Sequence, residues 1–560
     1  MSKVDVDLGD LLAKVLPTDV KVTVRHLSSI PKTTNALFAA SPGEEPEPTF
    51  CENHFLSASV TSGQSGDGED GAEIIVFGIE VLVYTTAHLT TIFVSKADST
   101  GHLHLLNAAP KSSVLRRITN TFLSFLVQTH QRPGIRLVVS LFARAQNQYL
   151  FPGSIENAEK HVLDDRGLIK WWCRALDPIL REYEPESVSQ EQEKKNEESA
   201  RSSATAYLIV PSCDKFETRG FFPPTARADD KERPRWVNAY PLHQLCSNPD
   251  APPRSLVPRL PDDPKTRFLT DLDDELPENG SAAAAGEGAG RWKSVSTLDQ
   301  FWELMSFRQE CSAGRLVGFL WLVINPPGVV NSNPMLSSKE GIACLPAHPK
   351  VNSAKERASE VKDVPRTDTQ TGLAVLEQIQ DSATATTETQ LPSVPAISAH
   401  QHQDSETSKP EPETQAVHSQ PNDQKAQSAN DRSAFIWPRA ARGHATLSDE
   451  DYKTATNFLL ELDFYNEEVS FTSTKAFNDK LAALADKVWI GQVVVGKSTE
   501  ESTVPPQTPA APANTLTVRK RKKEDSTPGQ AEQAASASAE SKEAGVNVLQ
   551  ANLIRKKKKT

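Results

Sequence analysis

The segment with the clearest capacity for chemistry is Pro-Asp-Asp-Pro-Lys at positions 261–265. Asp262 and Asp263 place two carboxylates side by side, and the flanking prolines restrict the backbone around them. A carboxylate can accept a proton from a reacting group, and burial or a like-charged neighbour raises its pKa toward a useful value. Residue type and spacing leave two interpretations open, an acid–base site or an ordinary surface turn.

Two local motifs of common enzyme classes are absent. The sequence contains neither G-x-S-x-G nor H-E-x-x-H, the signatures of many hydrolases and zinc proteases. Its six cysteines include no C-x-x-C pair, so a zinc ribbon is not expected, and six in 560 residues do not suggest a disulfide framework. We therefore expect no metal and a reducing compartment.

Hydrophobic patterning predicts interleaved strands and helices. Nearly continuous apolar runs predict strands at 74–84, 90–95, 135–142, 206–210 and 316–324, with a polar turn at 96–101. Amphipathic spacing predicts helices at 2–16, 165–183, 298–307, 449–462 and 475–488, and another that is capped by Ser112 or Ser113 and stops at 132–134. This order predicts an α/β (α+β) fold with a mixed central β-sheet surrounded by helices.

Composition divides the chain into one catalytic domain and segments that lack a core. We expect residues 1–345 to form the core, with flexible inserts near 184–203 and 277–290. Residues 346–434 are rich in Ser, Thr, Gln, Glu and Pro, which predicts a disordered insert. Residues 435–490 are expected to add helices that complete the core, followed by a disordered basic tail at 491–560.

The charge is spread unevenly along the chain. The net charge is −12, and residues 501–560 hold 11 Lys+Arg and 6 Asp+Glu, so this tail is +5 and the remainder is −17. An acidic body suits a basic partner and argues against direct sequence-specific nucleic-acid binding. The absence of an apolar run of 18 residues or more argues against a membrane protein.

Five motifs, in order, resemble one known family. They are Ile-Phe-Val-Ser-Lys-Ala-Asp at 92–98, Gln-Tyr-Leu-Phe-Pro at 148–152 with Lys-His at 160–161 and Lys-Trp-Trp at 170–172, Pro-Asp-Asp-Pro-Lys-x-Arg-Phe at 261–268, Phe-Trp-Glu-Leu at 301–304 with Arg-Gln-Glu at 308–310, and the basic C-terminus. Together they resemble the fungal-specific histone H3 acetyltransferases of the regulator of Ty transposition type. The likeness covers most of 1–325 and, more loosely, 435–490.

The resemblance implies a fold similar to that of the CREB-binding-protein acetyltransferase, and it implies acetyl-CoA as cosubstrate. It makes Asp263 the proton acceptor, Asp262 its electrostatic neighbour and Lys265 a self-acetylation site. Further catalytic positions would be Asp98, Tyr149 and Trp172, the last two beside the acceptor lysine. The cofactor-binding residues that it implies are Ala97, Asp98, Ser99, Ser112, Ser113, Val114, Leu115, Arg116, Phe142, Gln146, His161, Val162, Leu163 and Trp171.

The resemblance also implies a setting for the reaction. The substrate would be newly made histone H3, presented as H3–H4, at position 56 and at tail lysines 9 and 27. A nucleosome-assembly-protein-like chaperone and an anti-silencing-function chaperone would stimulate or present it, in replication-coupled nucleosome assembly, the DNA-damage response, transcription regulation and genome stability. The basic clusters at 519–523 and 555–559 would direct the protein to the nucleus. The alternatives are a non-catalytic histone or chaperone adaptor and, less consistent with the acidic body, a nucleic-acid-binding regulator.

Overall fold

A computed structural model describes residues 7–41, 44–61, 72–106, 111–186, 201–276, 291–308, 311, 314–329 and 437–499. Its helices are α1 (Leu8–Val15), α2 (Lys111–His130), α3 (Asp165–Arg181), α5 (Lys215–Arg219), α6 (Leu242–Leu245), α7 (Pro264–Asp273), α8 (Leu298–Met305), α9 (Asp449–Glu461) and α10 (Glu467–Leu484). Its strands are β1 (Lys21–Ser29), β2 (Lys32–Thr34), β3 (Thr49–Thr61), β4 (Glu73–Thr85), β5 (Leu89–Ser99), β6 (Arg136–Arg144), β7 (Ser203–Ile209), β8 (Trp236–Val237), β9 (Val317–Asn325), β10 (Ala445–Leu447) and β11 (Gln492–Val495).

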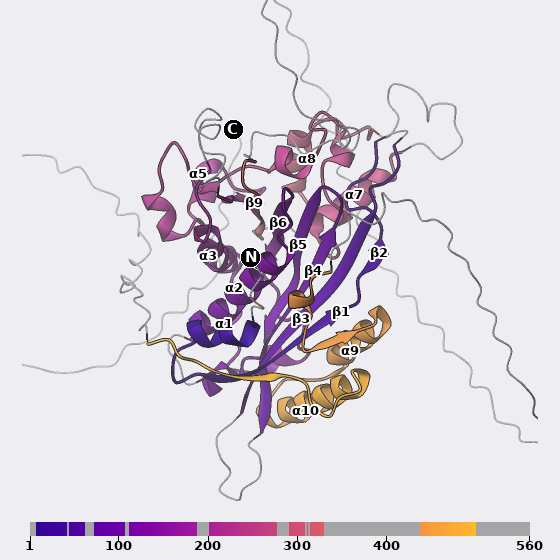
Figure 1. The fold of residues 1–560 in the computed structure, drawn as a ribbon. Helices are drawn as coiled ribbons and strands as arrows, with labels where there is room; N and C mark the ends of the chain where they lie inside the picture. Colours follow the sequence, from indigo (N-terminus) through magenta and orange to yellow (C-terminus); the bar gives the residue numbers. More distant parts are fainter. Residues whose placement is uncertain are drawn as a thin grey trace, which may run out of the picture. The chain divides into compact units, whose positions relative to one another are not determined.

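All of these strands belong to one mixed sheet (Figure 1). Their order is β10-β1-β3-β4-β5-β6-β9-β7-β8, with β11 beside β1 and β2 beside β3. The pairs β5–β6, β7–β8 and β1–β10 are parallel, and the remaining pairs are antiparallel. The predicted mixed sheet with surrounding helices is therefore confirmed.

Helices cover both faces of the sheet. Successive strand residues point to opposite faces, so Val81 and Val83 of β4 join the core that contains α1, α2 and α3, whereas Tyr84 joins the one that contains α7 and α8. At the other end of that second face, Phe55 of β3 and Ile75 of β4 pack with α9 and α10. Among the described residues, no helix has the length and apolar character needed to cross a membrane.

The long strands β1 and β3 were not predicted from the sequence. Both carry polar residues in buried positions, which hides the apolar alternation of a strand. Several of those residues have partners on other strands. Arg25 pairs with Glu73 and donates to Ser59, and the ring of His26 lies 3.0 Å from that of His54.

Several predicted boundaries are wrong. Residues 96–99 were expected in a turn but continue β5, because β4 extends far enough to pair with them. Ser112 and Ser113 lie inside the first turn of α2 and do not precede it. Helix α10 begins at Glu467, after the capping residue Asn466, eight positions before the predicted start.

The predicted tail at 491–560 begins too early, since β11 occupies Gln492–Val495 and pairs with β1. The short link predicted between α2 and the next strand is present at residues 131–135. The predicted inserts at 346–434 and 277–290, most of the one at 184–203, and the basic clusters lie outside the described residues.

Candidate functional site

The parallel strands β5 and β6 separate near their carboxyl ends. Their pairing stops at Val94 and Leu141. Beyond it β5 runs on beside β4 to Ser99, and β6 runs on beside β9 to Arg144. Ser95 has no partner in β4, so a β-bulge lies where the strands part. Peptide groups on the facing edges there no longer pair with each other, as at many ligand sites of α/β proteins.

A cavity of about 490 Å³ lies at this opening. The ends of β5 and β6, the start of α2, the helix α3 and the loop before α3 all line it. Thirteen of the residues singled out from the sequence line it, namely Ala97, Asp98, Ser99, Leu115, Arg116, Phe142, Gln146, Tyr149, His161, Val162, Leu163, Trp171 and Trp172. The fold thus brings together motifs that are up to 75 positions apart in the sequence.

The lining combines apolar walls with an excess of positive charge. Six cationic side chains and one carboxylate contribute to it, namely Lys96, Arg116, Arg144, Lys160, Lys170 and Arg174 against Asp98. Burial lowers the pKa of the Arg116 guanidinium, and the neighbouring Arg174 and Arg117 lower it further. Cations held together in this way favour an anionic ligand such as a phosphate group.

Asp98 holds two loops against β5. Its Oδ2 accepts backbone N–H groups of Tyr149 at 2.7 Å and Leu150 at 3.1 Å. Its Oδ1 accepts the backbone N–H of Ser99 at 2.8 Å and the Nζ of Lys160 at 2.9 Å. With four donors on two oxygens and 8% of its side chain exposed, this carboxylate shapes the cavity wall. It has little remaining capacity to accept a further hydrogen bond.

Two aromatic residues form a second wall. Trp172 is buried and meets Trp171 edge to face, with ring centroids 4.9 Å apart. Tyr149 donates its hydroxyl to the backbone carbonyl of Arg144. Burial raises the pKa of this phenol above its usual value, although Arg144 opposes the shift. Tyr149 is therefore a neutral phenol at ordinary pH.

Asp263 is a buried residue at the start of α7. Its side chain accepts the backbone N–H of Lys265 at 2.9 Å, as a helix N-cap, and forms an ion pair with the same residue's Nζ at 2.5 Å. Both side chains are 1% exposed, and the Nζ lies 4.1 Å from the ring centroid of Phe319. Burial lowers the pKa of Lys265, and the carboxylate of Asp263 partly offsets this.

Asp262 differs from its neighbour in every respect. Its backbone has a φ of +57°, a left-handed conformation that Asp tolerates better than most residues. Its side chain is 56% exposed, with Oδ2 3.1 Å from the Nζ of Lys96. Burial alone would lower the pKa of Lys96, but Glu80 and Asp262 raise it above its usual value. Because Lys96 lines the cavity, Asp262 is joined to the cavity wall through one ion pair.

The structure does not bring every predicted residue to the cavity. Asp262, Asp263 and Lys265 lie outside its lining. Val114 is buried in the core beneath α2, and Ser113 is buried but does not line the cavity. The side chain of Ser112 lies outside the described residues.

No functional role was predicted for the cations Lys96, Lys160, Lys170 and Arg174. Lys160 is 3% exposed and contacts both Asp98 and Ser154. Lys96, Lys160 and Lys170 lie within the family motifs and Arg174 lies outside them, but the place of all four in the cavity depends on three separate elements converging.

One phosphate-binding pattern in the sequence is coincidental. Residues 491–498 read Gly-Gln-Val-Val-Val-Gly-Lys-Ser, which matches G-x-x-x-x-G-K-[ST]. A phosphate-binding loop requires a turn between a strand and a helix. Here the middle of the pattern is β11 itself, and the backbone N–H groups of Lys497 and Ser498 donate to carbonyls of Ala13 and Leu16. The pattern is therefore not a nucleotide site.

Comparison with known proteins identifies the family. The model of the histone acetyltransferase KAT11-type domain matches residues 8–136 and 132–480. The chain is 61% identical over 592 aligned positions to histone acetyltransferase rtt109 of Aspergillus flavus, with all of both proteins covered. The chain belongs to the KAT11-type histone acetyltransferase family.

Two further comparisons agree with this assignment. Histone acetyltransferase rtt109 of Schizosaccharomyces pombe is 32% identical over 252 residues, which are 44% of this chain and 56% of that protein. The crystal structure of Rtt109 from Aspergillus fumigatus matches with a TM-score of 0.67 and 57% identity, and the match covers 88% of this chain and 100% of that one. The family and the enzyme class expected from the five motifs are thus confirmed.

Proposed function

We propose that the chain transfers the acetyl group of acetyl-CoA, bound in the cavity between β5 and β6, to lysines of histone H3. The observation that carries this proposal is the cavity itself, which has apolar walls, six cations and one engaged carboxylate. Acetyl-CoA needs an apolar slot for its pantetheine arm and cations for its phosphates. Arg116, Lys170 and Arg174 suit the phosphates, and the open edges of β5 and β6 suit the amide-containing arm.

The reaction requires removal of a proton before the new bond can form. A lysine ammonium has a pKa of about 10.4 and attacks only as the free amine. The amine nitrogen then bonds to the thioester carbonyl carbon, the carbon–sulfur bond breaks, and the thiolate of coenzyme A leaves. We assign the proton-accepting role to Asp263, with Asp262 as its electrostatic neighbour.

Self-acetylation of Lys265 would prepare Asp263 for this role. In the structure the carboxylate is neutralised by the buried Nζ of Lys265. Acetylation removes that positive charge but leaves an amide N–H that can still donate. A buried carboxylate without a cationic partner holds a proton more readily, which improves it as a base.

The walls of the cavity supply orientation. Tyr149 and Trp172 would enclose the aliphatic part of the acceptor lysine, and an aromatic face also attracts the ammonium before deprotonation. Asp98 would act as a positioning residue, because its four hydrogen bonds fix the loops that carry Tyr149 and Lys160.

The substrate and setting follow from family resemblance and charge. We propose newly synthesised H3–H4 as substrate, with acetylation at position 56 and at tail lysines 9 and 27, in the nucleus during replication-coupled nucleosome assembly. A nucleosome-assembly-protein-like chaperone and an anti-silencing-function chaperone would stimulate the reaction. The −17 charge of residues 1–500 supports attraction of a basic histone. The proposed transfer uses no metal and no direct binding to DNA sequence.

The test combines the full chain, acetyl-CoA and H3–H4, with and without each chaperone, and resolves acetylated lysines by mass spectrometry. Asp263→Asn should reduce turnover by 100-fold or more, since a general base contributes about 10²–10⁴-fold. Asp214→Asn is the matched control, because Asp214 is also a helix N-cap but is exposed, at the start of α5. Acetyl transfer by the wild type is required, and its absence would favour a non-catalytic adaptor. Full activity of Asp263→Asn would remove Asp263 from the mechanism.

A further inference from the structure

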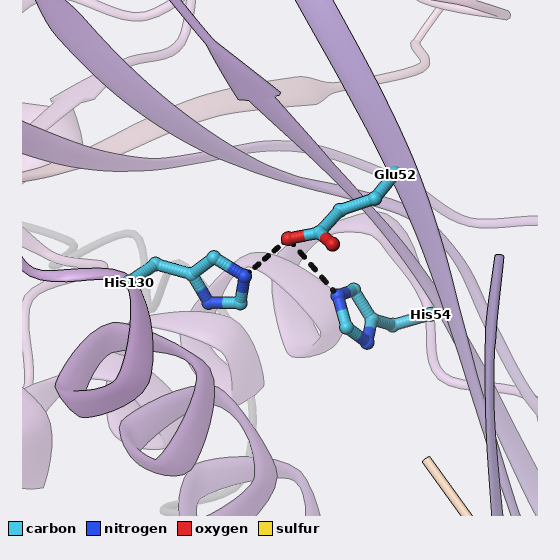
Figure 2. Close-up of side chains that lie close together, drawn as sticks. All are labelled: Glu52, His54 and His130. Atoms are coloured by element: carbon cyan, nitrogen blue, oxygen red, sulfur yellow. Dashed lines mark hydrogen bonds and ion pairs between the residues drawn. The ribbon is translucent and has the colours of Figure 1, made fainter. Parts of the chain in front are cut away.

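Three buried side chains away from the cavity point toward one another: Glu52, His54 and His130 (Figure 2). Glu52 and His54 are two positions apart on β3 and so share one face of the strand. His130 is the last residue of α2. They are 4%, 0% and 4% exposed, and one ligand atom from each lies within 4.8 Å of the others.

The hydrogen bonds of His130 determine where its lone pair points. Its Nδ1 is 2.8 Å from the backbone carbonyl of Leu126, which can only accept, so Nδ1 carries a proton. In the neutral ring the Nε2 then presents a lone pair to Oε1 of Glu52, with which it is in close contact. Two lone pairs cannot face each other at this range without a cation or a further proton between them.

His54 and Glu52 also have polar side-chain atoms without a hydrogen-bond partner in this cluster. The Nε2 of His54 has no hydrogen-bond partner and lies 3.7 Å from Oε1 of Glu52, and the second carboxylate oxygen of Glu52 also has none. The Nδ1 of His54 lies 3.0 Å from Nε2 of His26, to which it can donate. Buried polar atoms without partners are unfavourable, so their convergence indicates a missing ligand.

We infer that Glu52, His54 and His130 bind a divalent transition metal ion, with Zn²⁺ as the best match to two imidazoles and one carboxylate. Around a tetrahedral zinc, ligand atoms about 2.0–2.1 Å from the metal lie roughly 3.3–3.4 Å apart. The 3.7 Å separation of His54 and Glu52 is already close to this, whereas His130 must move slightly outward. Each histidine has its Nδ1 held by another group, the usual way in which a ligand ring is oriented.

The metal would be structural. None of the three residues lines the cavity. His130 follows the cavity residue Arg116 by 14 positions on the straight run of α2, about 21 Å at 1.5 Å per residue. The ion would instead tie the end of α2 to β3. This revises the expectation that the protein holds no metal, because Glu52 and His130 are too far apart in sequence to form a recognisable motif.

A second cluster provides an internal control. His102, His104 and Glu467 also lie close together, but Nε2 of His102 already contacts the Ser470 hydroxyl and His104 is 33% exposed. A metal at the buried cluster should therefore be insensitive to His104→Ala.

The decisive measurement is the metal content of the untagged full chain expressed in zinc-supplemented medium. We expect about one zinc per chain in the wild type and in His104→Ala, and at least a fivefold lower content in His130→Gln and Glu52→Gln. X-ray absorption of the zinc-loaded wild type should show nitrogen and oxygen ligands only. This second measurement does not depend on any variant folding.

Three results would overturn the inference. One is a wild-type protein that contains no zinc and takes up neither Zn²⁺ nor Co²⁺ on refolding. Another is equal metal content in wild type and in soluble, folded His130→Gln. The third is a sulfur ligand in the absorption spectrum, which would place the metal at a cysteine. In the first case a protonated His130 paired with Glu52 is the correct description.

Discussion

The buried ion pair between Asp263 and Lys265 permits a quantitative test of how α7 is held in place. Both side chains are 1% exposed, and Nζ and Oδ2 are 2.5 Å apart. Removing one member of such a pair leaves the other charge buried without compensation, which costs about 3–5 kcal/mol. Asp263→Asn and Lys265→Met should each lower the free energy of unfolding by this amount. Asn remains a good helix cap, so the loss in Asp263→Asn reports the charge.

The double variant separates the ion pair from general damage to the core. With both charges gone, the remaining penalty is about that of one unsatisfied buried amide, roughly 1–3 kcal/mol. Independent substitutions would instead sum to about 6–10 kcal/mol. Urea unfolding, followed by tryptophan fluorescence and extrapolated linearly, gives all four free energies. A double variant that loses the sum of the two single effects would refute the coupling, and Asp214→Asn should stay within about 0.5 kcal/mol of wild type.

The pH dependence of Asp263→Asn has a definite sign. Burial lowers the pKa of Lys265 below its ordinary 10.5, and replacing Asp263 removes the main group that offsets this shift. Between the lowered pKa and 10.5 the unfolded chain binds more protons than the folded one, so stability rises with pH across that window. The variant should therefore recover part of its lost stability, relative to wild type, as the pH rises through that window toward 10.5. A variant that instead weakens relative to wild type over this range would show that Lys265 is not buried as a cation.

Three further outcomes are expected. Arg116→Ala should raise the KM for acetyl-CoA by about 10- to 100-fold, because one charge-assisted contact is lost. The control Arg219→Ala, at an exposed position of α5, should change this KM less than twofold. Equal changes in KM for the two variants would place the phosphates elsewhere. Cys173 should carry no acetyl group after incubation with acetyl-CoA and should resist alkylation in the native protein, because burial raises the pKa of its thiol. An acetylated Cys173 peptide in mass spectra would contradict this. Gly318→Ala should lower the free energy of unfolding by about 1–3 kcal/mol, because the new Cβ would lie 2.9 Å from Cγ1 of Ile169. An unchanged midpoint of urea unfolding would show that α3 can move away from the new methyl group.

Strands with apolar runs were predictable, and strands with buried polar pairs were not. β4, β6 and β9 are nearly continuous in apolar residues and follow from composition. β1 was missed because its buried Arg25 and His26 are satisfied only by residues from other strands. A pattern along one chain segment cannot reveal a partner that is supplied 28 or 48 positions away.

The candidate site, too, was predictable only in part. The family resemblance located half of the cavity lining, including Asp98 and Trp171, because those residues lie in contiguous segments. Arg174 lies outside the motifs and reaches the cavity only through the approach of three elements. The different environments of Asp262 and Asp263 were also not predictable, since a single left-handed residue exposes one carboxylate and buries the next.

The way in which β1 acquires its neighbours has a consequence for synthesis of the protein. β10 and β11 both pair with β1 on the side opposite β3, and Val495 of β11 follows Ser29 of β1 by 466 positions. During translation, that edge of β1 stays unpaired until residues 445–447 and 492–495 have been made. An unpaired edge invites pairing with another chain. A chain that terminates after β9 lacks β10 and β11, so it should aggregate through the unpaired edge of β1. A chaperone that shields this edge would be most needed before β10 and β11 leave the ribosome.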